Sequence, residues 1–63
     1  MKTATVMAND GRGWSKIATY SYGVAQEVIK DNGYKQHLMC CGFGENVSAC
    51  VIDDVTGEVI AEL

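Results

Sequence analysis

One stretch of this chain repeats its apolar residues at a clear helical spacing. The remaining segments between turn residues are short. In that stretch the apolar side chains recur three or four positions apart, the period of one helix face: Val24, Ala25, Val28 and Ile29. Ser21 suits the start of a helix, and Lys30 favours the negatively polarised end. We therefore predict one helix from Ser21 that closes over residues 30–33, with Gly33 in the left-handed conformation that ends many helices.

This helix depends on packing against another layer. Gly23 lowers its intrinsic stability by about 1 kcal/mol relative to alanine, and short isolated helices are unstable in water. The chain has 63 residues, a size at which only about 60% of the unfolded surface becomes buried. We therefore expect the helix to cover a sheet, and a second copy of the chain to add further burial as a homodimer.

The N-terminal third predicts a β-hairpin. Residues 3–8 alternate between two differently lined faces, and the sequence Asn-Asp-Gly-Arg-Gly at residues 9–13 then forms a turn. Residues 14–22 fit a strand with two tyrosines on one face. They also fit a helical stripe that continues into the next segment. We favour the strand, which pairs with the first one.

Turn chemistry divides the rest of the chain into three more strands. These predicted strands cover residues 34–41, 47–53 and 58–63, with turns at residues 42–46 and 54–57. Gly57 suits the end of a hairpin loop, where a positive φ is needed. Residues 1–63 therefore form a single small α+β domain with one helix packed on a mainly antiparallel sheet. The predicted order is ββαβββ, or βαβββ if residues 14–22 are helical.

Composition indicates a folded chain in a reducing compartment. The hydrophobic fraction is 48% and the charged fraction 21%, values that argue against intrinsic disorder. Cys40 and Cys41 are adjacent and poorly placed for a mutual disulfide, and Cys50 makes the number odd. The first residues lack the apolar core of a signal peptide, and no apolar run has the length of a membrane span. We therefore expect a cytoplasmic protein that does not enter a membrane.

Charge is distributed unevenly along the chain. All five lysines and arginines lie within residues 1–35, whereas residues 36–63 carry five acids and no lysine or arginine. Four of these acids belong to the final predicted hairpin and are candidate partner-binding residues: Asp53, Asp54, Glu58 and Glu62. We expect this hairpin, or an edge of the sheet, to bind a larger protein with a basic surface. By analogy of size and charge alone, the chain suits a small inhibitor or accessory protein of a phage or mobile element.

The glycine-containing turn supports an alternative function. Its amides, together with two basic side chains and aromatic rings, could bind an anionic, nucleotide-like small molecule in a dimer. The candidate ligand-binding residues are Arg12, Trp14, Lys16, Tyr20 and Tyr22. The simpler interpretation is that the glycines only form a turn, and that Trp14 anchors the core.

Other classes of function receive little support from the sequence. His37 and the three cysteines are residue types that bind zinc, but their spacing does not suit a metal site. In the predicted strand His37 and Cys41 would lie about 13 Å apart, which excludes direct contact between imidazole and thiol. We therefore predict no enzyme activity, no cofactor and no metal. A pI near 4.7 opposes binding to nucleic acid.

Overall fold

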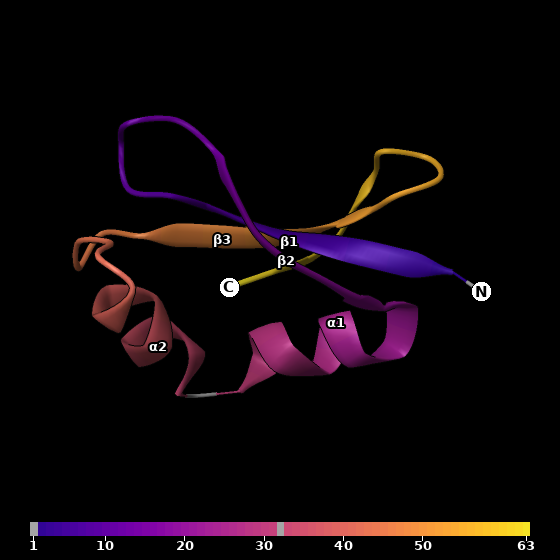
Figure 1. Cartoon of the computed structure of the whole chain (residues 1–63), viewed down its shortest axis with the longest axis horizontal. Coiled ribbons are helices and arrows are strands. Elements are labelled where there is room, and N and C mark those ends of the chain that lie inside the picture. The colour runs from indigo at the N-terminus through magenta and orange to yellow at the C-terminus, as the bar shows by residue number, and fades with distance from the viewer. Residues whose placement is uncertain (1, 32) are drawn as a thin grey trace.

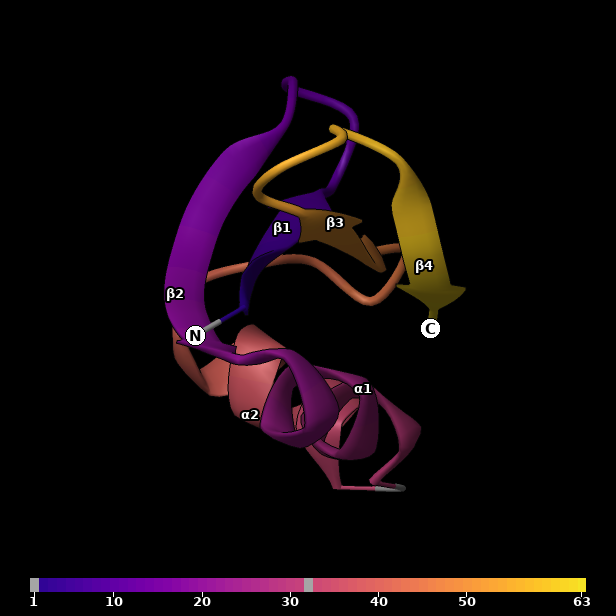
Figure 2. The same ribbon diagram turned by 90° about the vertical axis from the view of Figure 1, so that its right-hand side faces the viewer.

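The computed structural model describes residues 2–31 and 33–63 and shows a small α+β fold of two layers. Its elements are β1 (Thr3–Asn9), β2 (Ser15–Ser21), α1 (Tyr22–Lys30), α2 (Tyr34–Cys40), β3 (Ser48–Asp53) and β4 (Val59–Glu62). Both helices lie on the same side of a four-stranded antiparallel sheet (Figures 1 and 2). The predicted α+β class and the N-terminal hairpin are confirmed.

The sheet has the strand order β2-β1-β3-β4, which places the first strand in its centre. β1 pairs with β2 through the hairpin turn and with β3 from the distant C-terminal half of the chain. β4 pairs only with β3 and forms one edge, and β2 forms the other. The two ends of the sequence therefore depend on each other, because β1 must be paired on both sides before the sheet is complete.

The core lies between the sheet and the helices. On β1, Ala4, Val6 and Ala8 are fully buried, whereas the residues that alternate with them are only partly buried. From the helix layer, the core receives Ala25, Ile29, Tyr34 and Leu38, and from β3 it receives Ala49 and Val51. The small alanines allow α1 to lie close to the sheet, where it contacts all four strands.

The single predicted helix is confirmed in its extent as α1 and differs in how it ends. α1 begins after Ser21, which occupies the N-cap position without a side-chain hydrogen bond to the helix. The helix ends at Lys30. Gly33 has φ −83° and starts the second helix as its N-cap, so the predicted left-handed conformation is wrong. Asn32, part of the predicted turn, lies outside the described residues.

The strand predicted for residues 34–41 is wrong, because this segment forms α2. Tyr34 and Leu38 stand four positions apart, both are buried, and both face the core from one side of the helix. The segment contains no β-branched residue, whereas Leu, Met, Lys and Gln favour a helix. Its composition therefore indicated a helix where turn spacing suggested a strand.

Both hairpin loops rise on the side of the sheet opposite the helices (Figure 1). The β3–β4 loop is closed by two backbone hydrogen bonds, from Asp53 N to Glu58 O (2.9 Å) and from Gly57 N to Asp53 O (2.8 Å). Gly57 has φ 78°, as predicted for the end of this loop. The uncovered face of the sheet is thus bordered by two projecting loops.

Candidate functional site

The uncovered face of the sheet is the candidate site. It carries the residues of β1 that alternate with the buried alanines: Thr3, Thr5 and Met7. Sheet register adds the partners of these residues, which include Thr19 from β2 and Cys50 and Ile52 from β3. We call this surface the open face. No described helix covers it (Figure 2).

One half of the open face contains a hollow of about 310 Å³ with both apolar and polar residues in its lining. Its lining comes from the β1–β2 loop, β3, β4 and the C-terminal residue: Trp14, Ser48, Ala49, Cys50, Val59, Glu62 and Leu63. Trp14 is 53% exposed, Val59 52% and Leu63 46%. The interpretation of Trp14 as a core anchor is therefore wrong. The largest aromatic side chain of the protein instead lies at the surface beside other exposed apolar groups.

Strand register explains why this hollow forms. Cys50 pairs with Glu62, and Ile52 pairs with Val59, so these side chains meet across β3 and β4. The backbone N–H of Leu63 donates to the carbonyl of Ala49 (2.9 Å) and holds the last residue against β3. Burial, and then the negative charge of Glu62, raise the pKa of the Cys50 thiol. Cys50 is thus a buried thiol among the residues that line the hollow.

The other half of the open face is polar. The Asp54 carboxylate accepts hydrogen bonds from Thr3 Oγ1 and Thr5 Oγ1, each 2.6 Å long. Thr5 Oγ1 also lies 3.0 Å from Thr19 Oγ1 on β2. The hydrogen bonds from Thr3 and then Thr5 lower the pKa of Asp54, and the charge of Lys16 acts in the same direction. The β3–β4 loop is thereby tied to the central strand.

The four predicted acidic residues occupy different environments. Asp53 is only 6% exposed, and its Oδ1 accepts hydrogen bonds from the amides of Val55 (2.8 Å) and Thr56 (3.3 Å). Its carboxylate therefore stabilises the loop. Asp54 is exposed but bonded to β1, while Glu58 and Glu62 are exposed to solvent.

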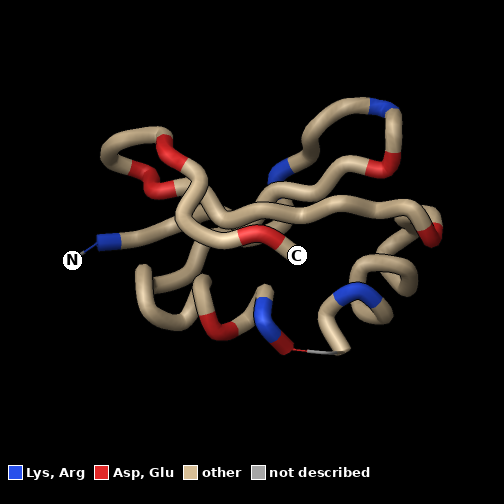
Figure 3. Tube along the Cα trace, turned by 180° about the vertical axis from the view of Figure 1, so that it is seen from behind, with Lys and Arg blue, Asp and Glu red and all other residues tan. Residues whose placement is uncertain are grey.

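Charge differs between the two loops that border the open face. Acidic residues gather on the β3–β4 loop, whereas the β1–β2 loop carries both signs (Figure 3). Arg12 forms an ion pair of 2.8 Å with Asp10 in that second loop. This hydrogen-bonded pairing lowers the pKa of Asp10 and raises the pKa of Arg12. Among the described residues, no ion pair involves the acids of the β3–β4 loop, whereas Arg12 and Asp10 offset each other in the β1–β2 loop.

The residues predicted to bind an anionic ligand are not brought together. Arg12 and Trp14 lie in the β1–β2 loop and Lys16 near the start of β2. Tyr20 lies near the far end of β2 and Tyr22 begins α1, and both tyrosines pack against the core. The amides that could bind an anion already have an acceptor within the loop. Asn9 Oδ1 receives hydrogen bonds from Gly11 N (2.7 Å) and Gly13 N (3.3 Å).

The histidine and cysteines differ from expectation because their segment is helical. Cys41 Sγ lies 3.9 Å from His37 Nε2, so the exclusion of this contact was wrong. Residues four apart are neighbours on a helix but are widely separated on a strand. All three cysteines are free thiols, and Cys50 is buried. Among the described residues, no group of three or more metal-ligating side chains is assembled.

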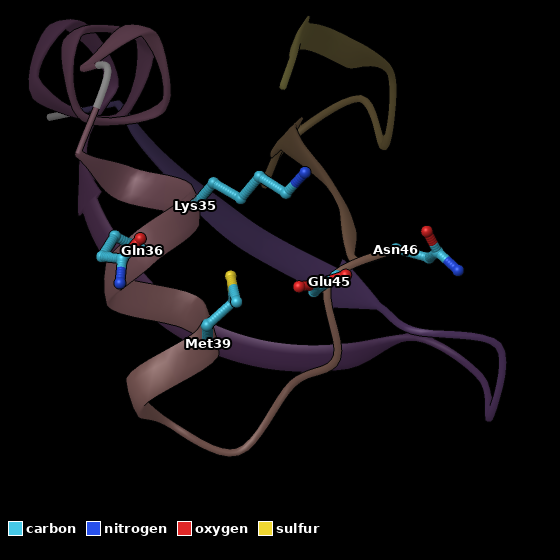
Figure 4. Close-up of a pocket in the computed structure, with 5 residues that line it drawn as sticks. All are labelled: Lys35, Gln36, Met39, Glu45 and Asn46. Carbon is cyan, nitrogen blue, oxygen red and sulfur yellow. The ribbon is translucent and has the colours of Figure 1, made fainter.

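A second depression, of about 420 Å³, lies between α2 and the segment that leads into β3. Its lining residues are Lys35, Gln36, Met39, Glu45 and Asn46. Lys35 extends from the helix toward the side where Glu45 lies, and Asn46 points away (Figure 4). All of these residues except Met39 are exposed. With no buried polar group to orient a ligand, this depression is a weaker candidate than the open face.

Comparisons with other proteins add no assignment. No protein-family model, no curated protein and no solved structure matches this chain. Within residues 2–31 and 33–63, neither helix has the length and apolar character needed to cross a bilayer.

The sequence prediction missed Val59, Leu63 and Cys50 as site residues. The alternation in the last strand was visible in the sequence, but only the folded structure shows that these residues line one hollow with Trp14.

Proposed function

We propose that this chain is a non-enzymatic binding protein whose open face docks on a larger protein with a basic surface. The observation that carries this proposal is the group of exposed apolar side chains around one hollow: Trp14, Val59 and Leu63. Aromatic and aliphatic side chains around a surface hollow are typical of the energetic centre of protein interfaces. An apolar side chain of the partner would fill the hollow.

The acids around the open face favour a basic partner. Glu62 lines the hollow itself, and Asp54 and Glu58 lie on the adjoining loop. Lysine or arginine side chains of the partner would face these carboxylates at the rim and would increase the rate and specificity of association. Because Asp54 is held by two threonine hydroxyls, its carboxylate is already oriented before the partner arrives.

The same acids disfavour a second copy of the chain as the occupant. A two-fold interface places the same patch on both subunits. If the two hollows met across such an axis, the Glu62 carboxylates would approach each other next to buried apolar surface, where like charges repel most strongly. We therefore assign the open face to a different protein, which the docked chain would cover as small inhibitor proteins do.

A displayed peptide library tests this proposal without knowledge of the natural partner. Peptides selected for binding to the immobilised chain should combine one large apolar residue with flanking lysine or arginine. Trp14→Ala should weaken the best peptide by about tenfold or more, since central aromatic side chains carry much of the energy of an interface. Glu58→Lys with Glu62→Lys should also weaken it and reduce the dependence of binding on salt.

The matched control lies on the helix side. Val24 is 48% exposed on α1, and Val24→Ala should leave peptide affinity unchanged. Selection of peptides without basic residues, or equal loss with Val24→Ala and Trp14→Ala, would contradict the proposal. Sedimentation analysis of the free chain provides a second test. If the chain is a dimer and Trp14→Ala makes it a monomer, then another copy of the chain, and not a different protein, binds the open face.

A further inference from the structure

The three thiols of this protein differ in accessibility and in their neighbours. Cys50 is buried in the sheet, and burial raises the pKa of its thiol. Cys40 and Cys41 are both exposed at the end of α2. Among the described residues, only Cys41 has a hydrogen-bond contact with an imidazole. Accessibility therefore leaves two candidate nucleophiles, and the neighbouring histidine distinguishes them.

The helix brings the imidazole and the thiol together. His37 Nε2 lies 3.9 Å from Cys41 Sγ, at the long end of the range for a hydrogen bond to sulfur. The His37 ring stacks on the ring of Tyr34, with centroids 5.7 Å apart and an angle of 30° between the planes. Tyr34 is 6% exposed, so a buried residue limits the movement of the imidazole.

A second feature concerns Tyr34, the first residue of α2, whose ring stacks on that of His37. The Tyr34 hydroxyl is buried, and no described residue forms a hydrogen bond with it. Burial first, and then negative charge on Tyr20 and Cys41, raise the pKa of Tyr34. A buried hydroxyl without a hydrogen-bond partner is uncommon in protein structures. This hydroxyl belongs to Tyr34, the residue whose ring stacks on the imidazole of His37.

The electrostatics of the helix end explain why a reactive Cys41 thiol requires His37 beside it. The carboxyl end of a helix is negatively polarised, which favours a cation and disfavours an anion. His37 lies in the last turn of α2, and Cys41 is its C-cap. The helix end therefore opposes negative charge at Cys41, and the His37 ring in contact with this thiol is placed to take its proton. The same helix end acts on Cys40, which lacks this contact.

We propose that Cys41 is a site of thiol–disulfide exchange with low-molecular-weight disulfides, and that His37 acts as its base. In the neutral tautomer with hydrogen on Nδ1, His37 Nε2 accepts the proton of the Cys41 thiol. The resulting thiolate attacks one sulfur of the disulfide, and a new S–S bond forms as the old one breaks. The departing thiolate takes the proton from His37. The products are a mixed disulfide on Cys41 and one small thiol, with no net oxidation.

Exchange with dithiodipyridine, a neutral aromatic disulfide that releases a coloured thione, tests this proposal directly. The Cys40→Ser chain retains Cys41 as its exposed thiol, and the Cys41→Ser chain retains Cys40. Near neutral pH the first should react about tenfold faster than the second, because a neighbouring base increases the thiolate fraction. Adding His37→Gln should abolish the advantage of Cys41 and leave the rate of Cys40 unchanged.

Exchange rates measured in urea show whether the reactivity of Cys41 depends on the folded structure. In concentrated urea the Cys40→Ser and Cys41→Ser chains, which both then also expose Cys50, should react at the same rate, since unfolding separates the imidazole from the thiol. Equal rates in the folded state, an unchanged Cys41 rate after His37→Gln, or a difference that persists in urea would each overturn the proposal. Circular dichroism of each variant shows whether the exposed substitutions preserve the fold. This site does not depend on the proposed docking function, because it lies on the helix side of the molecule.

Discussion

The two faces of the sheet are lined by the same strands and have opposite roles. On β1, Ala4, Val6 and Ala8 are fully buried beneath the helices, while Thr3 and Thr5 alternate with them on the open face. One face therefore contributes most of the buried apolar surface that stabilises the fold. The other combines exposed apolar groups with an oriented carboxylate and contributes less to stability.

This difference separates folding from binding in a very small chain. Because side chains alternate along a strand, substitutions at neighbouring positions of β1 act on different layers. A small domain has little stability to lose. Its binding surface can nevertheless be changed without loss of the fold if the covered face remains intact.

The largest expected effect comes from the covered side. Leu38 is fully buried, so Leu38→Ala should lower the free energy of unfolding by about 2–5 kcal/mol through lost burial and a residual cavity. Val59, which is 52% exposed on the open face, should lose less than about 1 kcal/mol when replaced by alanine. Urea unfolding of both variants measures the contrast, and equal losses would remove the distinction between the faces.

An intermediate effect is expected in the loop that borders the open face. Gly57 has φ 78°, and a side chain there would have free space but a strained backbone. Gly57→Ala should destabilise the protein by about 1–2 kcal/mol. Gly44 also has free space and lacks a positive φ, so Gly44→Ala is the matched control and should be nearly neutral. Thermal unfolding of both variants compares them, and equal shifts would show that backbone strain is not the cause.

The smallest effect is a pH dependence on the polar half of the open face. Hydrogen bonds from Thr3 and then Thr5 lower the pKa of Asp54. A lowered pKa means that this carboxylate stabilises the folded state above about pH 4, its range in the unfolded chain. The contribution disappears as pH falls through the lowered value. The wild-type protein should therefore lose more thermal stability on acidification than Asp54→Asn.

Asp10 also has a lowered pKa, because it is hydrogen-bonded to Arg12, so the Asp54→Asn protein should still show some acid sensitivity. Melting temperatures measured from neutral to acidic pH give both curves. Parallel curves would show that the threonine–carboxylate network does not contribute to stability.

Much of the fold followed from local sequence signals. The apolar spacing after Ser21 predicted α1, and the glycine-containing turns predicted β2, β3 and β4. The strand predicted for residues 34–41 was wrong because the turn residues on either side were given more weight than the absence of β-branched residues within the segment. That error also concealed the contact of His37 with Cys41, since the two are close only on a helix.

The site was less predictable because it depends on pairing between distant segments. The acids of the final hairpin were identified from charge alone, but the burial of Asp53 depends on the hydrogen bonds of its own loop. The exposure of Trp14 could not be read from its sequence neighbours. It follows from the position of the β1–β2 loop above a face that no helix covers.

Quenching of Trp14 fluorescence by acrylamide tests the central claim most directly. Trp14 is the only tryptophan and is 53% exposed at the edge of the hollow, so its emission reports on the open face. With a saturating amount of a selected peptide that lacks tryptophan, quenching should fall clearly below that of the free chain. Unchanged quenching while the peptide is bound would place the binding surface elsewhere on the molecule and contradict the account.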